Sequence, residues 1–498
     1  MQFIMPSSRL RLAARHCHFT RMTTVAATPA LPAAPPGPAA PNALLSAPIL
    51  PALVRFALPN MAAMLATALA TVAETAYVGS FGVPALAGMA LVFPLVMLQM
   101  MLSAGAMGGG VSSAISRALG AGDAARANAL AVHAMWIGVA AGALTSLLML
   151  SFGPALYAGL GGRGEALDEA AAYSGVAFCG SIGVWLMNMF ASVLRGSGNM
   201  MVPSVTFLVV SLAQVLIGGA LGLGWGPLPR LGMAGVAAGQ VIAFGAGAAY
   251  LYVYLRGGRS KVSLSVRATP LRGKLFGDIL RVGALACFSP LQTVATVMIL
   301  TWLVAQFGPT ALAGYGIGAR LEFLLVPIAF AIGVASVPLV GMAVGAGLVA
   351  RAKRVAWTAA AMATAVLGLL GLVLAFAPDL WTRLFTDDPA VVASAALYFH
   401  WAGPAYGLFG LGLCLYFSAL GAGKVGGLVL AGTLRLVVVA VGGWLLARAQ
   451  AEPWTIFALV ALGMAVFGAA AVVAVRYTRW GNDAAAHEPA LPAHGRRR

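Results

Sequence analysis

Residues 81–88 read FGVPALAG, and residues 307–314 repeat this stretch as FGPTALAG, 226 positions later. Two shorter glycine-containing matches share an offset of 225: residues 120–122 with 345–347, and residues 196–198 with 421–423. Three matches in the same order and at nearly the same spacing indicate that the chain consists of two similar halves.

The sequence around these repeats is strongly apolar. The 498-residue chain is 61% hydrophobic and 9% charged, whereas soluble domains carry about 25% charged residues. Its apolar runs reach about 20 residues, which is long enough to cross a bilayer core. We therefore predict an all-α membrane protein with about 12 transmembrane helices in two pseudo-symmetric six-helix lobes. The expected helices are 52–79, 85–113, 128–152, 168–193, 200–222, 232–255, 280–306, 311–343, 355–377, 390–418, 426–447 and 454–476.

The formal net charge is +17, and the basic residues concentrate in alternate connections between the expected helices. Cytoplasmic loops of membrane proteins have this bias, so the pattern predicts that both termini are cytoplasmic. It argues against a nucleic-acid partner, since no basic patch is interleaved with aromatic residues. We expect a disordered cytoplasmic N-terminal arm (1–48), an N-lobe (49–256), a basic cytoplasmic linker (257–279), a C-lobe (280–478) and a cytoplasmic tail (479–498).

Short motifs in the two halves add a family resemblance. They are Leu-Arg-Gly-Ser-Gly at 194–198 followed by Pro203, a glycine- and alanine-rich run at 232–238, Glu74-Thr75 followed by Gly79, Leu-Gly-Ala-Gly at 420–423, and Arg435. In these motifs and their order, residues 50–478 resemble the multidrug and toxic compound extrusion (MATE) family of efflux antiporters.

The resemblance implies a V-shaped pair of lobes that rock to open a central cavity to either side. Small cationic or aromatic substrates leave in exchange for incoming protons or sodium ions. We expect a monomer in a bacterial inner (plasma) membrane, with no enzymatic activity, cofactor or resident metal. Two other functions stay open: a lipid-linked precursor flippase of the same superfamily, and a narrow metabolite exporter.

A polar stripe marks the first expected helix. Asn60, Thr67, Thr71 and Glu74 follow one another at spacings of 7, 4 and 3, which places them on one helical face, and Tyr77 extends it. A polar stripe on a membrane helix faces a cavity or the protein interior. An acid at membrane depth is a functional candidate, because its charge is costly there. Glu74 also matches the acid in the family's first helix, so we predict that it binds the coupling ion.

Amide side chains could assist Glu74. The fifth helix of the family often carries an Asn and, four residues later, an Asp; this chain has Gln214 and Gly218. Asn188 is a further candidate, for which packing is the alternative role. One carboxylate suffices for a proton, whereas sodium prefers several hard oxygen ligands. We therefore favour protons over sodium as the coupling ion.

The second half carries fewer polar candidates. Glu322 lies in an expected helix, two residues from Arg320, and residues at that spacing do not face each other. Glu322 would either bind a cationic substrate or pair with another helix. Gln292 and His400 lie in helices that contain coupling acids in some family members, and both remain candidates. Because the intramembrane charges are mainly acidic, we expect cationic cargo.

Overall fold

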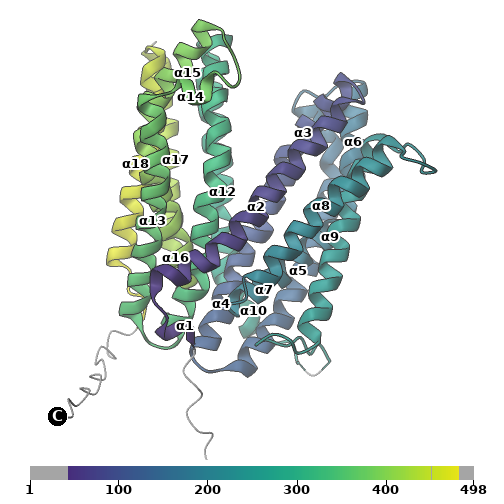
Figure 1. The fold of residues 1–498 in the computed structure, drawn as a ribbon, viewed down its shortest axis with the longest axis vertical. Coiled ribbons are helices and arrows are strands. Elements are labelled where there is room, and N and C mark those ends of the chain that lie inside the picture. The colour runs from purple at the N-terminus through teal and green to yellow at the C-terminus, as the bar shows by residue number, and fades with distance from the viewer. Residues whose placement is uncertain (1–42, 268, 450, 482–498) are drawn as a thin grey trace, which may run out of the picture. The chain divides into compact units, whose positions relative to one another are not determined.

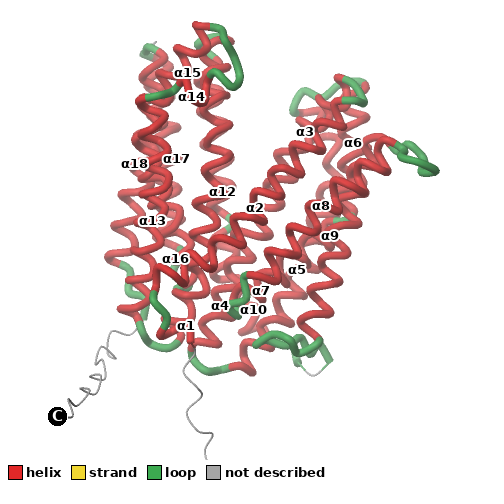
Figure 2. Tube along the Cα trace, viewed as in Figure 1, coloured by secondary structure: helices red, strands yellow, loops and turns green. Residues whose placement is uncertain are grey.

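The computed structural model describes residues 43–267, 269–449 and 451–481. Throughout these residues the chain forms helices and loops without a strand (Figure 2). Within the described residues, eleven helices are long and apolar enough to span a membrane, and a bent pair brings the number to 12. The prediction of an all-helical membrane protein with about 12 spans is confirmed.

The helices form two bundles (Figure 1). The first contains α2 (Ile49–Gly79), α3 (Val83–Met100), η1 (Met101–Met107), α4 (Gly108–Gly120), α5 (Ala124–Gly159), α6 (Glu165–Cys179), α7 (Ser181–Gly196), α8 (Met201–Leu223) and α9 (Gly232–Arg256). The second half of the chain begins with α10 (Gly273–Ala286), which packs mainly on the first bundle, and the second bundle contains α11 (Phe288–Ala305), α12 (Pro309–Gly345), α13 (Val349–Phe376), α14 (Asp379–Thr382), α15 (Pro389–Ala402), η2 (Gly403–Ala405), α16 (Tyr406–Gly421), α17 (Gly426–Arg448) and α18 (Pro453–Tyr477). A short helix, α1 (Ala43–Ser46), precedes them.

Several spans among the described residues are interrupted, and three of the breaks contain small residues or prolines. The bent pair α6 and α7 turns by 48° at Gly180, where Val241 would lie 2.4 Å from an added Cβ. The break between α15 and α16 contains Gly403 and Pro404, and proline removes a backbone hydrogen bond. The span from α3 to α4 contains the π-helix η1, a feature that occurs often at functional sites.

The structure changes two predicted segment boundaries. Helix α10 begins at Gly273, so the last part of the predicted linker (257–279) is helical. The basic residues there suggested a loop, but α10 is amphipathic and packs against α4, α5 and η1. Residues 43–46 of the predicted disordered arm form α1, whereas 1–42 lie outside the described residues. In the predicted tail, Trp480 is buried and 482–498 lie outside the described residues.

The first segment of each half packs on the bundle that the other half forms. The start of α2 packs in the core of the second bundle, where Leu53 and Phe56 join Val340. Reciprocally, α10 packs against the first bundle and places Ile279 in its core. The first part of α2 therefore packs on the second bundle, and α10, which leads into α11, packs on the first bundle.

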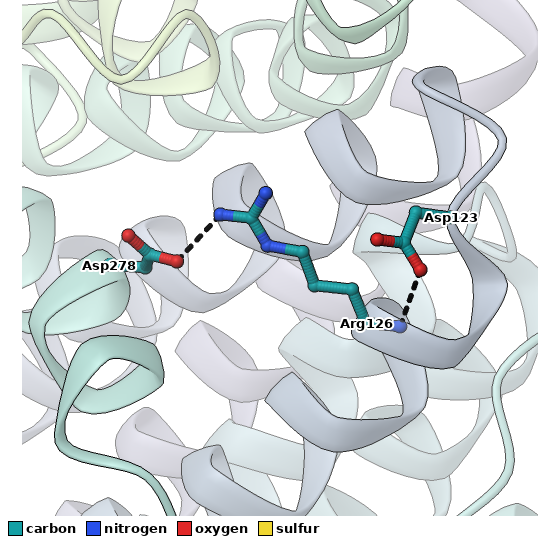
Figure 3. Close-up of polar contacts among 3 residues, drawn as sticks. All are labelled: Asp123, Arg126 and Asp278. Atoms are coloured by element: carbon teal, nitrogen blue, oxygen red, sulfur yellow. Dashed lines mark hydrogen bonds and ion pairs between the residues drawn. The ribbon is translucent and has the colours of Figure 1, made fainter.

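Two arginines 225 positions apart hold these exchanged segments. Arg126 follows the N-terminus of α5, which Asp123 caps, and its guanidinium pairs with Asp278 of α10 at 2.6 Å (Figure 3). Arg351, near the start of α13, donates to the carbonyls of Leu44 (3.1 Å) and Ala47 (2.5 Å). Both arginines therefore hold an exchanged segment in place. Arg126 does so through a carboxylate, whereas Arg351 does so through backbone carbonyls.

We expect the Arg126–Asp278 pair to contribute little to stability. The side chains are 48% and 29% exposed, and water screens exposed ion pairs, so the coupling should be below about 1 kcal/mol. The measurement is a double-mutant cycle of thermal unfolding with Arg126→Gln, Asp278→Asn and the double variant. A coupling well above that value would show that the pair is shielded from water.

The bundles also meet directly where α4 packs against α12 and α16. Ser113 Oγ donates to the carbonyl oxygens of Leu420 (2.5 Å) and Gly421 (3.0 Å), and Arg117 also donates to Gly421 O (3.4 Å). These carbonyls end α16, where a cation interacts favourably with the helix dipole. At the opposite end, α3 and α6 lie well apart from α14 and α15 (Figure 1).

Candidate functional site

A pocket lies inside the first bundle along the polar stripe of α2. Thr67, Thr71 and Glu74 line it, as the helical spacing predicts, and Gln214 of α8 faces them. Glu74 is 3% exposed, so its carboxylate is removed from solvent. The pocket has an empty volume of about 520 Å³, part of it open to the surface.

Hydrogen bonds connect α2 to α8 across this pocket. Gln214 Nε2 donates to Glu74 Oε1 at 2.5 Å, and the hydroxyls of Thr67 and Ser211 lie 3.2 Å apart. Thr71 bonds back to the Thr67 carbonyl at 3.1 Å. No ion pair to Glu74 occurs in the described part of the chain. A buried carboxylate without a positive partner can be neutralised by a proton or by a bound cation.

Two further polar residues of this pocket escaped the sequence analysis. Tyr173 of α6 and Gln240 of α9 line its wall, and the Tyr173 hydroxyl donates to Gln240 Oε1 at 3.2 Å. Neither residue belongs to a polar stripe, so helical periodicity carried no signal for them. The remaining wall is apolar and includes Met and aromatic residues: Met89, Phe93, Val96, Met97, Met100 and Phe244.

Tyr77 lies beside the position on α8 where the family often has an Asp. Its hydroxyl is buried without a hydrogen-bond partner among the described residues and would lie 3.1 Å from a Cβ added at Gly218. The Val236 carbonyl would lie at the same distance from that Cβ. A side chain at position 218 would therefore require Tyr77 or α9 to shift by a few tenths of an ångström.

Asn60 and Asn188 do not line this pocket. Asn60 is fully buried, and neither of its side-chain polar atoms has a hydrogen-bond partner among the residues that the structure describes. Asn188 Nδ2 donates to Ser103 Oγ of η1 and to the Val184 carbonyl, both at 3.0 Å. Asn188 therefore ties α7 to the π-helix, which fits the packing alternative.

A second cavity lies mainly in the second bundle. Gln292 and Thr296 of α11, Phe330 of α12 and Arg435 of α17 line it. Residues 101, 105 and 106 of η1 form the part of the cavity wall that belongs to the first bundle. Gln292 Nε2 donates to Thr433 Oγ1 of α17 at 2.7 Å, so α11 and α17 are linked as α2 and α8 are in the first bundle.

Glu322 and His400 lie outside both pockets. The partly buried Glu322 accepts a hydrogen bond from Tyr398 of α15, whereas Arg320 is exposed and stacks over Phe385 at 5.1 Å. Arg320 and Glu322 thus have separate partners, as their spacing predicts. His400 is exposed and contacts Trp401, so the structure does not bring it to the other candidates.

Comparison with known proteins places this architecture in a family. The MatE family model matches residues 59–221 and 286–445. The chain is 28% identical over 363 residues to the probable multidrug resistance protein NorM of Thermotoga maritima, covering 69% of this chain and 74% of that protein. It is 25% identical over 384 residues to the FAD transporter of Shewanella oneidensis, covering 76% and 84%.

Solved structures share the fold. A MOP superfamily transporter from Pyrococcus furiosus superposes with a TM-score of 0.79 at 20% identity, covering 87% of this chain and 96% of that one. The family model covers most spans of both bundles, but not α9 or α18, and it includes the stripe from Thr67 to Glu74. The chain therefore belongs to the MatE family of multidrug efflux transporters, the family predicted from its sequence motifs.

Proposed function

We propose that this protein is a secondary antiporter that exports small aromatic organic cations in exchange for protons. The observation that carries the proposal is Glu74, a buried acid without an ion-pair partner among the described residues, on the wall of a pocket rich in Met and Phe. Aromatic and Met side chains adapt to flat apolar cargo, and the carboxylate supplies the single charge.

Exchange follows from competition for one carboxylate. A cation that binds beside ionised Glu74 neutralises the buried charge, and a proton on Glu74 does the same. The two states are therefore mutually exclusive, so proton entry and cation release are linked. Gln214 donates to the carboxylate and holds it toward α8. Sodium is the alternative ion, with oxygens of Thr67, Thr71 and Gln214 as its further ligands.

The contact between α4 and the second bundle supports alternating access. It joins the bundles at the end that the charge pattern predicts to be cytoplasmic, and its bonds from Ser113 and Arg117 must break for that end to open. In this proposal the protein is a monomer in a bacterial inner membrane with both termini in the cytoplasm. A flippase or a narrow metabolite exporter is the alternative.

The experiment measures ethidium transport by the purified protein in proteoliposomes with an imposed pH gradient or sodium gradient. In a one-for-one exchange that moves no net charge, one pH unit supports about a tenfold ethidium gradient. We expect the pH gradient alone to drive transport and nigericin, which collapses it, to stop transport.

Transport driven by the sodium gradient alone would replace the proton with sodium and leave the exchange itself intact. No ethidium movement under either gradient would contradict the proposed function.

A further inference from the structure

The second cavity contains a positive charge that the cationic-cargo expectation does not use. Arg435 of α17 is 9% exposed and lies on the cavity wall. Its Nε is buried without a hydrogen-bond partner, and the residue forms no ion pair within the described parts of the chain. Its guanidinium stacks 5.3 Å from the centre of the Phe409 ring. Arg435 therefore retains donors that can reach a ligand.

A buried guanidinium that forms no ion pair needs another group to stabilise its charge. Removing a guanidinium from water is strongly unfavourable unless an opposite charge or hydrogen bonds replace the lost hydration. Glu322 is near enough to interact electrostatically with Arg435, yet it forms no direct ion pair with it and accepts a hydrogen bond from Tyr398. Glu322 also lies off the cavity wall, so the space in front of Arg435 stays accessible to an anion.

The other wall groups define what kind of anion fits. Aromatic rings from three helices surround the space: Phe330, Phe409, Tyr416, Phe417 and Phe467. Gln292 Oε1 is buried without a hydrogen-bond partner in the part of the chain that the structure describes, and it can accept a hydrogen bond from a ligand N–H or O–H. The cavity has an empty volume of about 810 Å³, part of it open to the surface.

We propose that this cavity binds aromatic organic anions, with Arg435 gripping the carboxylate. Arginine holds a carboxylate through two parallel charge-assisted hydrogen bonds, and the rings favour a flat apolar body. The inference extends the cargo of the proposed export function to anions and rests on that function for its physiological role. It also departs from the sequence expectation of cationic cargo, which rested on the mainly acidic intramembrane charges.

Arg195 provides a matched comparison. It is also a buried arginine, its Nε also lacks a partner, and it stacks over Phe207 at 5.3 Å. Arg195 differs from Arg435 in lining neither of the two pockets described above. Loss of Arg195 therefore tests for general damage from removing a buried guanidinium.

The experiment measures binding of two ligands of similar shape and opposite charge, 1-naphthoate and 1-naphthylmethylammonium, to the purified full-length protein by calorimetry. We expect 1-naphthoate to bind, and Arg435→Gln to weaken it by about tenfold or more because charge-assisted hydrogen bonds are lost. Arg435→Lys should restore part of the affinity, and Arg195→Gln should leave it unchanged.

Two results would overturn the site: undiminished 1-naphthoate binding by folded Arg435→Gln, or no binding of 1-naphthoate by the wild-type protein. The second criterion needs no variant, so it decides the matter even if Arg435→Gln fails to fold. Ethidium transport by the same preparation separates the two hypotheses, since failed ethidium transport with intact 1-naphthoate binding contradicts only the proposed function.

Discussion

Glu74→Gln stops proton-driven ethidium transport while the protein remains folded in the membrane. Glutamine has nearly the same shape as glutamate and can stay near Gln214, but it cannot take up or release a proton. Burying a neutral amide costs less than burying a carboxylate, so stability should be equal or higher. The measurement compares transport driven by a pH gradient in proteoliposomes containing equal amounts of each protein.

Glu74→Asp is the matched control, since it keeps the titratable group but withdraws it from Gln214 by about one methylene length. We expect this variant to retain partial transport. If Glu74→Gln transported ethidium at the wild-type rate, Glu74 would not carry the proton, and Glu322 would be the next acid to test.

Gly345→Ala forces the two bundles apart at the α4–α12 contact and impairs transport. A Cβ at Gly345 would lie 2.1 Å from the carbonyl oxygen of Arg117, and one at Gly120 would lie 2.2 Å from that of Met342. These two contacts are related by the repeat, and both involve backbone atoms that no side-chain rotation can move. A clash of this kind costs about 1–3 kcal/mol, enough to change the ratio of closed to open states about tenfold.

Labelling of a buried reporter measures this opening. Ser116 is fully buried on α4, so Ser116→Cys in a background without native cysteines should react slowly with a membrane-impermeant thiol reagent. Adding Gly345→Ala should raise that rate about tenfold. The control is Gly245→Ala, a helical glycine around which an added Cβ meets no atom within 4 Å. Equal labelling in both variants would show that the contact tolerates a methyl group.

The sequence determined those features that can be recognised along the chain without knowing which helices touch. Apolar runs predicted the spans, the repeated stretches predicted the two halves, and the spacing from Thr67 to Glu74 predicted the polar face of α2 that lines the first pocket. The motifs predicted the family. These signals are local because a span must satisfy its own backbone hydrogen bonds in lipid.

Only the tertiary structure decided which faces of different helices meet. It showed that Tyr173 and Gln240 line the Glu74 pocket and that Arg435 lines the second cavity. It also showed that Tyr398 donates a hydrogen bond to Glu322. Membrane helices are apolar on nearly every side, so hydrophobic periodicity does not distinguish a face that packs on protein from one that meets lipid. Close approach at small residues sets those pairings, and such residues occur throughout a chain with 62 glycines.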